Sequence, residues 1–204
     1  MLAPLPRPGN ADLSAAATTA PLTTGGNRIA GAPGQPGERE MADQEEPQVA
    51  RRARELLELS GNCAQSSFAA LAEHLRFDPG STLKALTPFP GIALRGETCG
   101  AVTGSLMAIG MVLGRDRLDD GPGMQPSVKA ARRFCRAFDE EFGGTPCRVV
   151  LERGLGGTFD LTRPEEVAAY VAAGGPGLCS RLVGRSVVLA AEAIEHAADS
   201  GRAS

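Results

Sequence analysis

The fold is decided by residues 98–114, which read TCGAVTGSLMAIGMVLG and contain no charged side chain. The run has 17 residues, fewer than the roughly 20 that a helix needs to span a membrane, and Glu97 and Arg115 bound it with charge. A short charge-free run of this kind is typical of a helix that is buried in a protein core. We therefore predict a central buried helix over residues 99–113 and no membrane span.

Small residues dominate this run. Gly100 with Gly104, and Gly110 with Gly114, lie one helical turn apart, so a neighbouring helix can approach the backbone closely at each pair. The chain of 204 residues also holds seven Phe, one Tyr and no Trp. Strands draw on aromatic and β-branched residues, whereas Ala, Leu and Gly suit closely packed helices. These features predict an all-α fold, a compact bundle around a central Gly/Ala-rich helix.

The chain from Pro47 onward reads as a succession of helices separated by Gly and Pro. Asn62 with Gln65, and Thr162 with Glu165, match the capping-box pattern at two helix starts. Further helices are predicted where the apolar residues recur at helical spacing. The predicted ranges are 47–60, 62–75, 99–113, 127–142, 145–153, 164–173 and 178–198, with stops at Gly61 and Gly143 and with Pro146 in the first helical position after a Thr145 cap.

The first 46 residues differ from the rest in composition. Residues 1–47 hold seven Pro and six Gly among Ala, Thr and polar residues, without sustained apolar periodicity. Such a segment cannot bury enough surface to offset the entropy of ordering, so we predict a disordered tail over 1–46 and a helical domain over 47–204. Met41 stands just before this domain and is an alternative start. Pro and polar residues interrupt the apolar stretch that a secretory signal needs, which predicts a cytoplasmic protein.

Four of the five cysteines are predicted in the first turn of a helix. The unpaired amides and the helix dipole there favour negative charge, and they can lower a thiol pKa from about 8.5 to between roughly 3.5 and 7.5. The thiolate is the form that binds metals and attacks disulfides. The candidate redox or metal-ligating residues are therefore Cys63, Cys99, Cys147 and Cys179, with Asn62, Gln65, Thr98, Gly100 and Gly104 as the neighbours that support them.

The fifth cysteine, Cys135, has a different setting. It lies in the middle of the helix predicted over 127–142, on an apolar stripe where burial would keep the thiol neutral and inert. We predict a purely structural role for it. The stripe consists of Val128, Ala131, Cys135, Phe138 and Phe142, with Phe134 beside it.

The spacing of the four candidate cysteines gives no local ligand motif. They are 36, 48 and 32 residues apart, without a Cys-x-x-Cys pair, so only the fold can bring them together. The net charge of −3 and the lack of a basic patch argue against nucleic acid or anionic lipid as a partner. The partners that remain are a redox protein and, through self-association, a second copy of the chain.

The order of five sequence elements resembles the C_GCAxxG_C_C family of redox-active proteins. These elements are GNCAQS, CGAVTGSLMAIG, FDEEFGGTPCRVVL, DLTRPEE and LCSRLVGRSVVLAAEAIE. The resemblance extends from Val49 to His196, includes the same four candidate cysteines and gives no role to Cys135. It implies a helical, cytoplasmic, redox-linked protein. The family name writes Gly-Cys-Ala, whereas in this chain the glycine follows Cys99.

Three functions remain open from the sequence. The first is an iron–sulfur cluster or another thiolate-bound metal, held by the four cysteines for electron transfer or cofactor assembly. The second is a metal-free thiol–disulfide module in which two cysteines cycle and the others support them. The third is a helical binding protein whose cysteines only pack.

Overall fold

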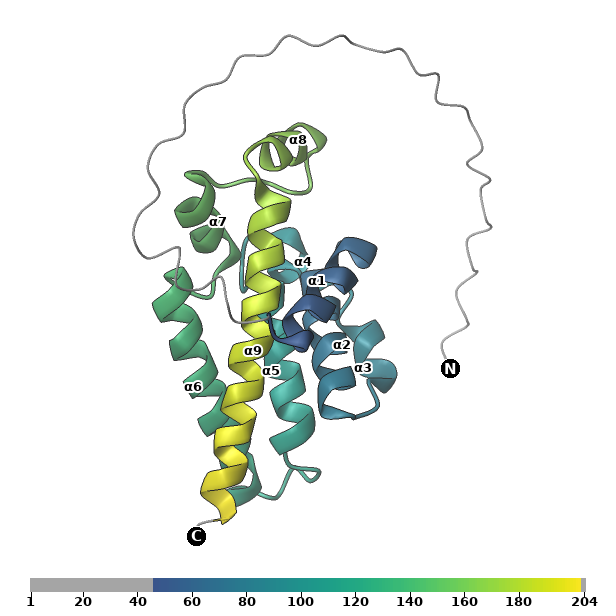
Figure 1. Ribbon diagram of the computed structural model, residues 1–204, viewed down its shortest axis with the longest axis vertical. Helices are drawn as coiled ribbons and strands as arrows, with labels where there is room; N and C mark the ends of the chain where they lie inside the picture. Colours follow the sequence, from purple (N-terminus) through teal and green to yellow (C-terminus); the bar gives the residue numbers. More distant parts are fainter. Residues whose placement is uncertain (1–45, 203–204) are drawn as a thin grey trace, which may run out of the picture. The chain divides into compact units, whose positions relative to one another are not determined.

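The computed structural model describes residues 46–202, so the predicted tail, apart from its last residue, and the alternative start at Met41 lie outside the described residues. Over the described range the fold is all-α, as predicted, with helices and no strand (Figure 1). The helices are α1 (Gln48–Ser60), α2 (Cys63–Leu75), α3 (Gly80–Ala85), α4 (Gly91–Leu94), α5 (Gly100–Leu113), α6 (Gln125–Phe142), α7 (Cys147–Leu155), α8 (Pro164–Ala172) and α9 (Gly175–Arg202), with a 3₁₀ turn at Pro122–Met124.

The longest helix of the described range, α9, organises the core. It packs against α1, α2, α5 and α6, and α7 and α8 contact it as well. Figure 1 shows α7 and α8 at the N-terminal end of α9, away from the C-terminus of the chain. Val183, Val187 and Ala190 recur at helical spacing on its inner face and are fully buried. The sequence predicted the start of this helix near residue 178, but it begins one turn earlier, at Gly175.

The Gly/Ala-rich helix α5 lies among α2, α6 and α9, in the central position that the sequence predicted. A side chain at Gly104 would collide with the backbone oxygen of Ala64, so this glycine permits the close approach of α2. The second glycine pair does not mark a helix contact, because nothing lies within 4 Å of a Cβ built on Gly110. Burial also ends before the last turn of α5, where Met111 and Val112 are exposed.

Polar groups fix the contact between α5 and α9. The hydroxyls of Ser105 and Ser186 are buried and lie 2.9 Å apart, and the Ser186 hydroxyl donates to the backbone oxygen of Ala101 at 2.9 Å. Paired in this way, the two hydroxyls avoid the cost of burying an unsatisfied polar group. The pairing also sets the register of α9 against α5.

Several helix ends match the sequence analysis. Gly61 and Gly143 end α1 and α6 with φ of 63° and 85°, in the left-handed region that favours glycine. At the start of α2, the Asn62 side chain accepts a hydrogen bond from the Gln65 amide at 3.0 Å. The reciprocal half of the predicted capping box is missing, because the Gln65 side-chain amide donates instead to the backbone oxygen of Leu83 at 2.9 Å.

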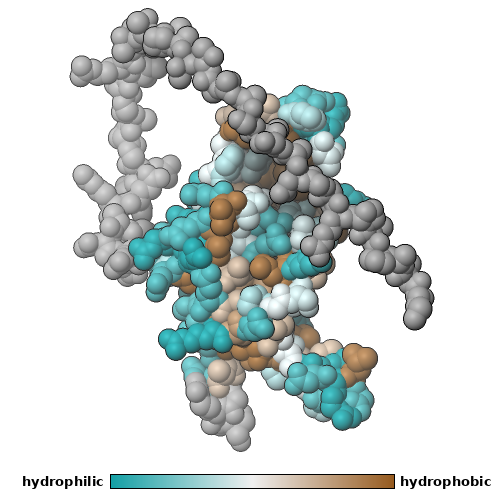
Figure 2. Space-filling view, turned by 90° about the vertical axis from the view of Figure 1, so that its right-hand side faces the viewer, coloured by the Kyte–Doolittle hydropathy of each residue, from teal (hydrophilic) through white to brown (hydrophobic). Residues whose placement is uncertain are grey.

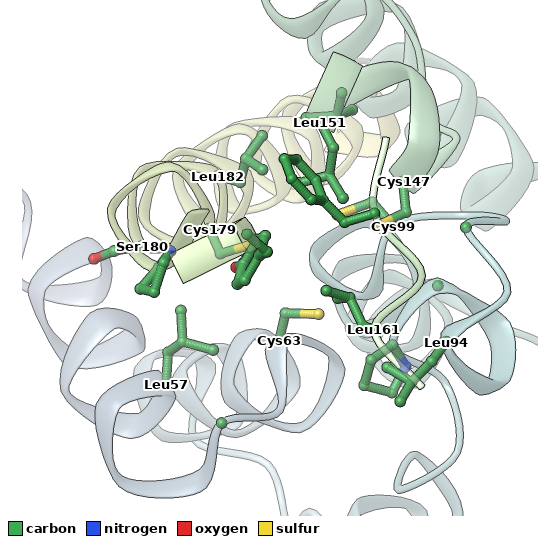
Figure 3. A pocket seen from close by; sticks show the side chains of 18 of the residues that line it. Leu57, Cys63, Leu94, Cys99, Cys147, Leu151, Leu161, Cys179, Ser180 and Leu182 are labelled. Atoms are coloured by element: carbon green, nitrogen blue, oxygen red, sulfur yellow. The ribbon is translucent and has the colours of Figure 1, made fainter. Parts of the chain in front are cut away.

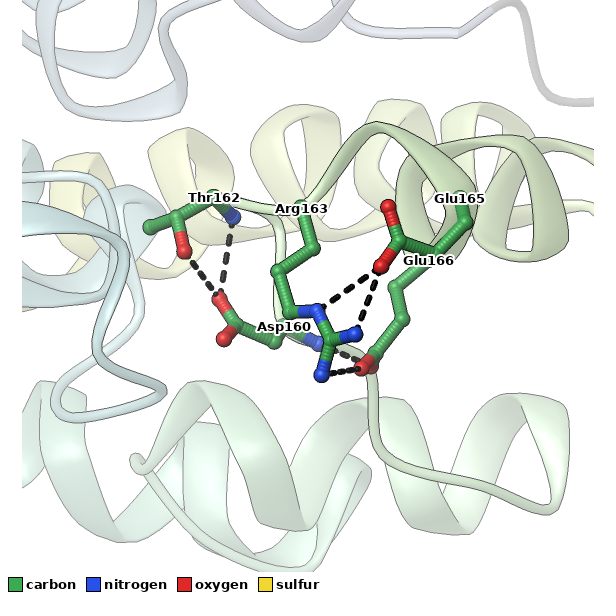
Figure 4. Close-up of polar contacts among 5 residues, drawn as sticks. All are labelled: Asp160, Thr162, Arg163, Glu165 and Glu166. Atoms are coloured by element: carbon green, nitrogen blue, oxygen red, sulfur yellow. Dashed lines mark hydrogen bonds and ion pairs between the residues drawn. The ribbon is translucent and has the colours of Figure 1, made fainter.

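The capping box predicted at Thr162 and Glu165 is wrong. Thr162 bonds backward to Asp160, whose carboxylate accepts both its amide and its hydroxyl hydrogen (Figure 4). The residue before α8 is Arg163, which pairs with Glu165 at 2.6 Å and has no capping side-chain bond. Asp160 thus satisfies both Thr162 donors, and α8 begins one residue later than a Thr162 cap would require.

Two other sequence expectations also need correction. The start of α7 has no Thr145 side-chain cap, because Pro146 is extended and the helix begins at the residue after it. The inner face of α6 is centred on Ala130, Phe134 and Phe138, so the predicted stripe is rotated and Val128 is exposed. The full burial of the Phe134 ring accounts for this rotation, since a large aromatic side chain gains more free energy from burial than a smaller one.

One face of the surface mixes hydrophobic and hydrophilic side chains. On the face seen in Figure 2, hydrophobic side chains are scattered among hydrophilic ones. No helix of the described residues is both long and apolar enough to cross a membrane.

Candidate thiol site

All four candidate cysteines line a single cavity of about 580 Å³. Cys63 is the first residue of α2, Cys99 immediately precedes α5, Cys147 is the first residue of α7 and Cys179 lies on α9. Figure 3 shows their sulfur-bearing side chains facing this one space from separate elements. Cys135 does not line the cavity; it lies on α6, partly buried. The fold thus brings together residues that are far apart in the sequence.

The inner pair of thiols, Cys63 and Cys99, lies where α2 meets α5. A Cβ on Gly100 would collide with the sulfur of Cys63 and would lie 2.9 Å from the amide nitrogen of Ala64. The sulfur therefore occupies space that only a glycine leaves free. The Cys63 thiol is also the largest cause of the raised pKa of the Cys99 thiol. Of this pair, Cys99 is almost completely buried, with 4% of its surface exposed, whereas Cys63 is partly exposed.

Asn62 fixes the start of α2 beside Cys63. Besides capping the helix, its side-chain amide donates to the backbone oxygen of Thr87 at 3.0 Å. The side-chain amide of Gln65 donates to the Thr87 hydroxyl at 3.1 Å. These two predicted neighbours therefore tie α2 to the connector that follows α3, and they act on Cys63 only through the backbone.

A backbone clasp joins Cys99 to Cys147. Thr98 and Pro146 form an isolated antiparallel bridge, in which the Cys99 amide donates to the Thr145 oxygen at 2.8 Å. The Cys147 amide donates in return to the oxygen of Glu97 at 2.5 Å. Thr98, predicted as a neighbour of the site, thus contributes its backbone. The clasp places the starts of α5 and α7 side by side.

The outer pair of thiols consists of Cys147 and Cys179, and the phenol of Tyr170 contacts the second of them. The Tyr170 hydroxyl donates to the sulfur of Cys179 at 3.0 Å. Its ring meets Phe159 edge-on, with centroids 5.9 Å apart, and a Cβ on Gly175 would collide with that ring. Cys179 itself is the fifth residue of α9, so it lies beyond the first turn in which the sequence predicted it.

One wall of the cavity is a strained turn. In α4 the three residues Ile92, Ala93 and Leu94 all have φ between 49° and 61°, in the left-handed region. Left-handed backbone costs about 1–2 kcal/mol for each residue with a side chain. Hydrogen bonds hold it, among them one from the Leu94 amide to the Pro90 oxygen at 2.8 Å. The turn brings Gly91 against Cys147, whose sulfur would lie 3.7 Å from a Cβ at that position.

The protonation of the site differs from the sequence prediction of lowered thiol pKa values. The Cys63 thiol and then burial raise the pKa of Cys99 well above its ordinary value. Burial raises the pKa of Cys147 to about 12. Burial also raises the pKa of Cys179, although the hydrogen bond from Tyr170 acts in the opposite direction. Removal from water thus outweighs the helix ends, and these three thiols are protonated near neutral pH.

For Cys135 the structure agrees with the expectation of a neutral thiol. Burial, and then the nearby charge of Asp139, raise its pKa. It lies on α6 and is not among the residues that line the cavity of the other four thiols.

The thiols as they lie do not fit a metal ion. Soft thiolates are the donors that iron–sulfur clusters and zinc prefer. Such a site needs each sulfur at about 2.3 Å from one ion. Among residues 46–202, no group of three or more His, Cys, Asp or Glu side chains is arranged to hold a metal.

Sequence reasoning missed Tyr170, Phe159 and the strained turn. Tyr170 is the single tyrosine of the chain, which is the one signal that could have singled it out. The left-handed conformation of residues 92–94 has no such signal, because Ile, Ala and Leu all disfavour it. Only the flanking prolines and glycines mark that segment as irregular.

Together these features define an all-helical protein with four thiols around one interior cavity. The family model described as "Putative redox-active protein (C_GCAxxG_C_C)" matches residues 61–193. The match covers more than half of the chain and includes all four cavity cysteines, so the protein belongs to this redox-active family. No curated protein and no solved structure was found to match the chain.

Proposed function

We propose that the protein is a thiol–disulfide redox protein whose cycling pair is Cys63 and Cys99. The observation that carries this proposal is the packing of the Cys63 sulfur against Gly100, the residue that follows Cys99, in a cavity that both thiols line. In the proposal, the two sulfurs approach each other to the bond length of a disulfide, about 2.05 Å. The membership in a redox-active family supports the same chemistry.

The two thiols differ in exposure, and this suggests the order of the reaction. Cys63, the more exposed thiol, loses its proton and attacks one sulfur of a substrate disulfide, which releases the first product thiol. Cys99 then loses its proton and attacks the sulfur of Cys63 in the mixed disulfide, which releases the second. Two protein thiols become one disulfide, and the substrate disulfide takes up two electrons and two protons as two thiols.

The outer pair supports this reaction in the proposal. The clasp holds Cys147 beside Cys99, where it can exchange with the newly formed disulfide. A reducing cytoplasm, as predicted from the sequence, would return all four thiols to the reduced state after each turnover. The physiological partner would then be a redox protein.

A thiolate metal or iron–sulfur centre is the second candidate. It is favoured by one observation, that four thiols line a single cavity. For such a centre, the sulfurs would have to move closer together and lose their protons.

One experiment separates these functions. The protein is purified without oxygen, and its metal content, absorption spectrum and thiol count are measured before and after oxidation with a small disulfide. We expect the count to fall by two from the five cysteines of the chain, with a Cys63–Cys99 bond identified by mass spectrometry. Cys135→Ser is the matched control and should also lose two thiols, whereas Cys63→Ser should form no bond within the inner pair.

The other outcomes have clear meanings. Stoichiometric metal that disappears when inner and outer cysteines are replaced by Ser would overturn the dithiol in favour of the metal centre. A full set of unreactive thiols without metal would leave only the helical binding protein.

A further inference from the structure

The thiol cavity has the size of a small-molecule site. Its volume of about 580 Å³ falls within the range of roughly 300–1,000 Å³ that is common for ligand pockets. Its walls are mainly aliphatic, and it is more than a gap between the sulfurs. The aliphatic lining consists of Leu57, Leu94, Val150, Leu151, Leu161 and Leu182.

An aromatic pair forms another wall. The rings of Phe159 and Tyr170 meet edge-on and both line the cavity. Such a pair offers a surface on which a flat ring can pack. The Tyr170 hydroxyl, whose hydrogen is donated to the sulfur of Cys179, places a polar group among the thiols.

The charges of the lining disfavour an anionic ligand. Among the described residues that line the cavity, Arg148 is the single cation, and Glu97 already pairs with it at 3.5 Å. An acidic residue, Glu58, is also in the lining. A peptide disulfide such as glutathione disulfide would bring several carboxylates to this site without free cations to meet them.

We infer that the cavity binds a small uncharged quinone, which accepts electrons from the thiols. This inference rests on the proposed Cys63–Cys99 pair and names its oxidant. Each thiol gives up its hydrogen, and one sulfur–sulfur bond forms. The two electrons and two protons pass to the quinone, whose two carbonyl oxygens become the hydroxyls of a hydroquinone.

The state of the thiols suits this acceptor. Cys99 keeps its proton because of the Cys63 thiol and its burial, so electrons and protons are available together inside the cavity. An apolar acceptor that takes up both leaves no net charge behind in an environment of low polarity.

The test uses the reduced full chain and duroquinone, whose four methyl groups prevent thiols from adding to the ring. We expect one duroquinol per chain, loss of two thiols, a Cys63–Cys99 bond and a rate that saturates with duroquinone concentration. The Cys63→Ser/Cys99→Ser double variant should still bind duroquinone in equilibrium dialysis but should not reduce it. Glutathione disulfide serves as the charged comparison oxidant, and free dithiothreitol serves as the reference for intrinsic reactivity.

A pair of matched substitutions tests the cavity itself. Leu161→Trp fills the lining without replacing a thiol, and it should slow oxidation by duroquinone by about tenfold. Leu118→Trp makes the same change at a side chain that is 91% exposed, and it should leave the rate unchanged. Circular dichroism verifies that both variants keep their helices.

The outcomes distinguish this inference from the function on which it rests. If glutathione disulfide forms the Cys63–Cys99 bond but duroquinone shows no saturation, no binding to the double variant or no response to Leu161→Trp, the quinone site is wrong and the dithiol stands. If neither oxidant removes two thiols, the dithiol and the quinone site both fail.

Discussion

The two halves of the thiol site are built differently. The inner pair, Cys63 and Cys99, lies in a tight contact between two core helices, where glycines allow the backbones to meet. The outer pair, Cys147 and Cys179, is held by a backbone clasp and by a phenol on α8, a helix with no buried residue. The inner half is therefore tied to the stability of the whole domain, whereas the outer half can change with little effect on the core.

At neutral pH, the largest effect that this comparison predicts is at the inner half. Gly104→Ala should lower the free energy of unfolding by about 2 kcal/mol, because its Cβ collides with the backbone oxygen of Ala64. The matched change Gly110→Ala meets nothing within 4 Å and should raise that free energy by about 0.5–1 kcal/mol through helix propensity. Urea unfolding measures both changes, and shifts of the same sign would contradict the difference between the two glycine pairs.

The next effect concerns pH and the outer thiol Cys147. In the unfolded chain the Cys147 thiol has its ordinary pKa of 9.0, whereas burial raises this pKa to about 12 in the folded chain. The folded state binds more protons in this window, so the contribution is complete below pH 9 and is lost as the pH rises toward 12. The free energy of unfolding should fall there by up to about 1.4 kcal/mol per pH unit for this thiol.

Cys147→Ser isolates that contribution from the other groups that titrate at high pH. Urea unfolding at a series of pH values should show a shallower decline for this variant than for the unmodified chain. Identical slopes would mean that the Cys147 thiol is not held protonated by the fold.

A smaller effect is expected at the phenol of the outer half. Tyr170→Phe keeps the ring but removes the hydrogen bond that lowers the pKa of Cys179, so that pKa should rise further. At a fixed pH near neutral, alkylation of Cys179 should slow by about two- to tenfold, which corresponds to a net hydrogen bond of roughly 0.5–1.5 kcal/mol. Mass spectrometry of the labelled peptide across a pH series gives the midpoint. A midpoint that is unchanged or lower would show that Tyr170 only packs.

The smallest effect is expected at the surface of the clasp. Glu97→Gln removes an ion pair with Arg148, at 3.5 Å between partly exposed side chains, but keeps the backbone bonds. The free energy of unfolding should change by less than about 0.5 kcal/mol, and less still at high salt. A larger loss in thermal or urea unfolding would show that side chains hold this clasp, in addition to the backbone.

The local features of the helices could be predicted from the sequence. Features that depend on local spacing were predictable: the glycine stop after α1, the Asn62 cap and the buried glycine run of α5. The grouping of the four cysteines could be suggested by their shared position near helix starts and by the family resemblance. These signals lie in neighbouring residues, so one chain is enough to read them.

Other features depend on how distant segments meet. The rotated face of α6 is set by the packing of Phe134, and the early start of α9 at Gly175 accompanies the close packing of the Tyr170 ring there. The raised thiol pKa values follow from burial in a cavity whose walls come from most of the helices. No spacing rule within a helix contains that information, which is why the predicted lowering of the pKa was wrong for Cys99, Cys147 and Cys179.

The packing of Gly100 against Cys63 has a consequence for how this sequence can vary between relatives. Because the sulfur of Cys63 fills the space where a side chain at position 100 would begin, position 100 must remain glycine as long as Cys63 is present. Across an alignment, relatives that keep the first cysteine should also keep the glycine, whereas relatives without that cysteine need not change the glycine. The amino acids found at these two positions in relatives therefore provide a test of the inner pair that needs no measurement on the protein.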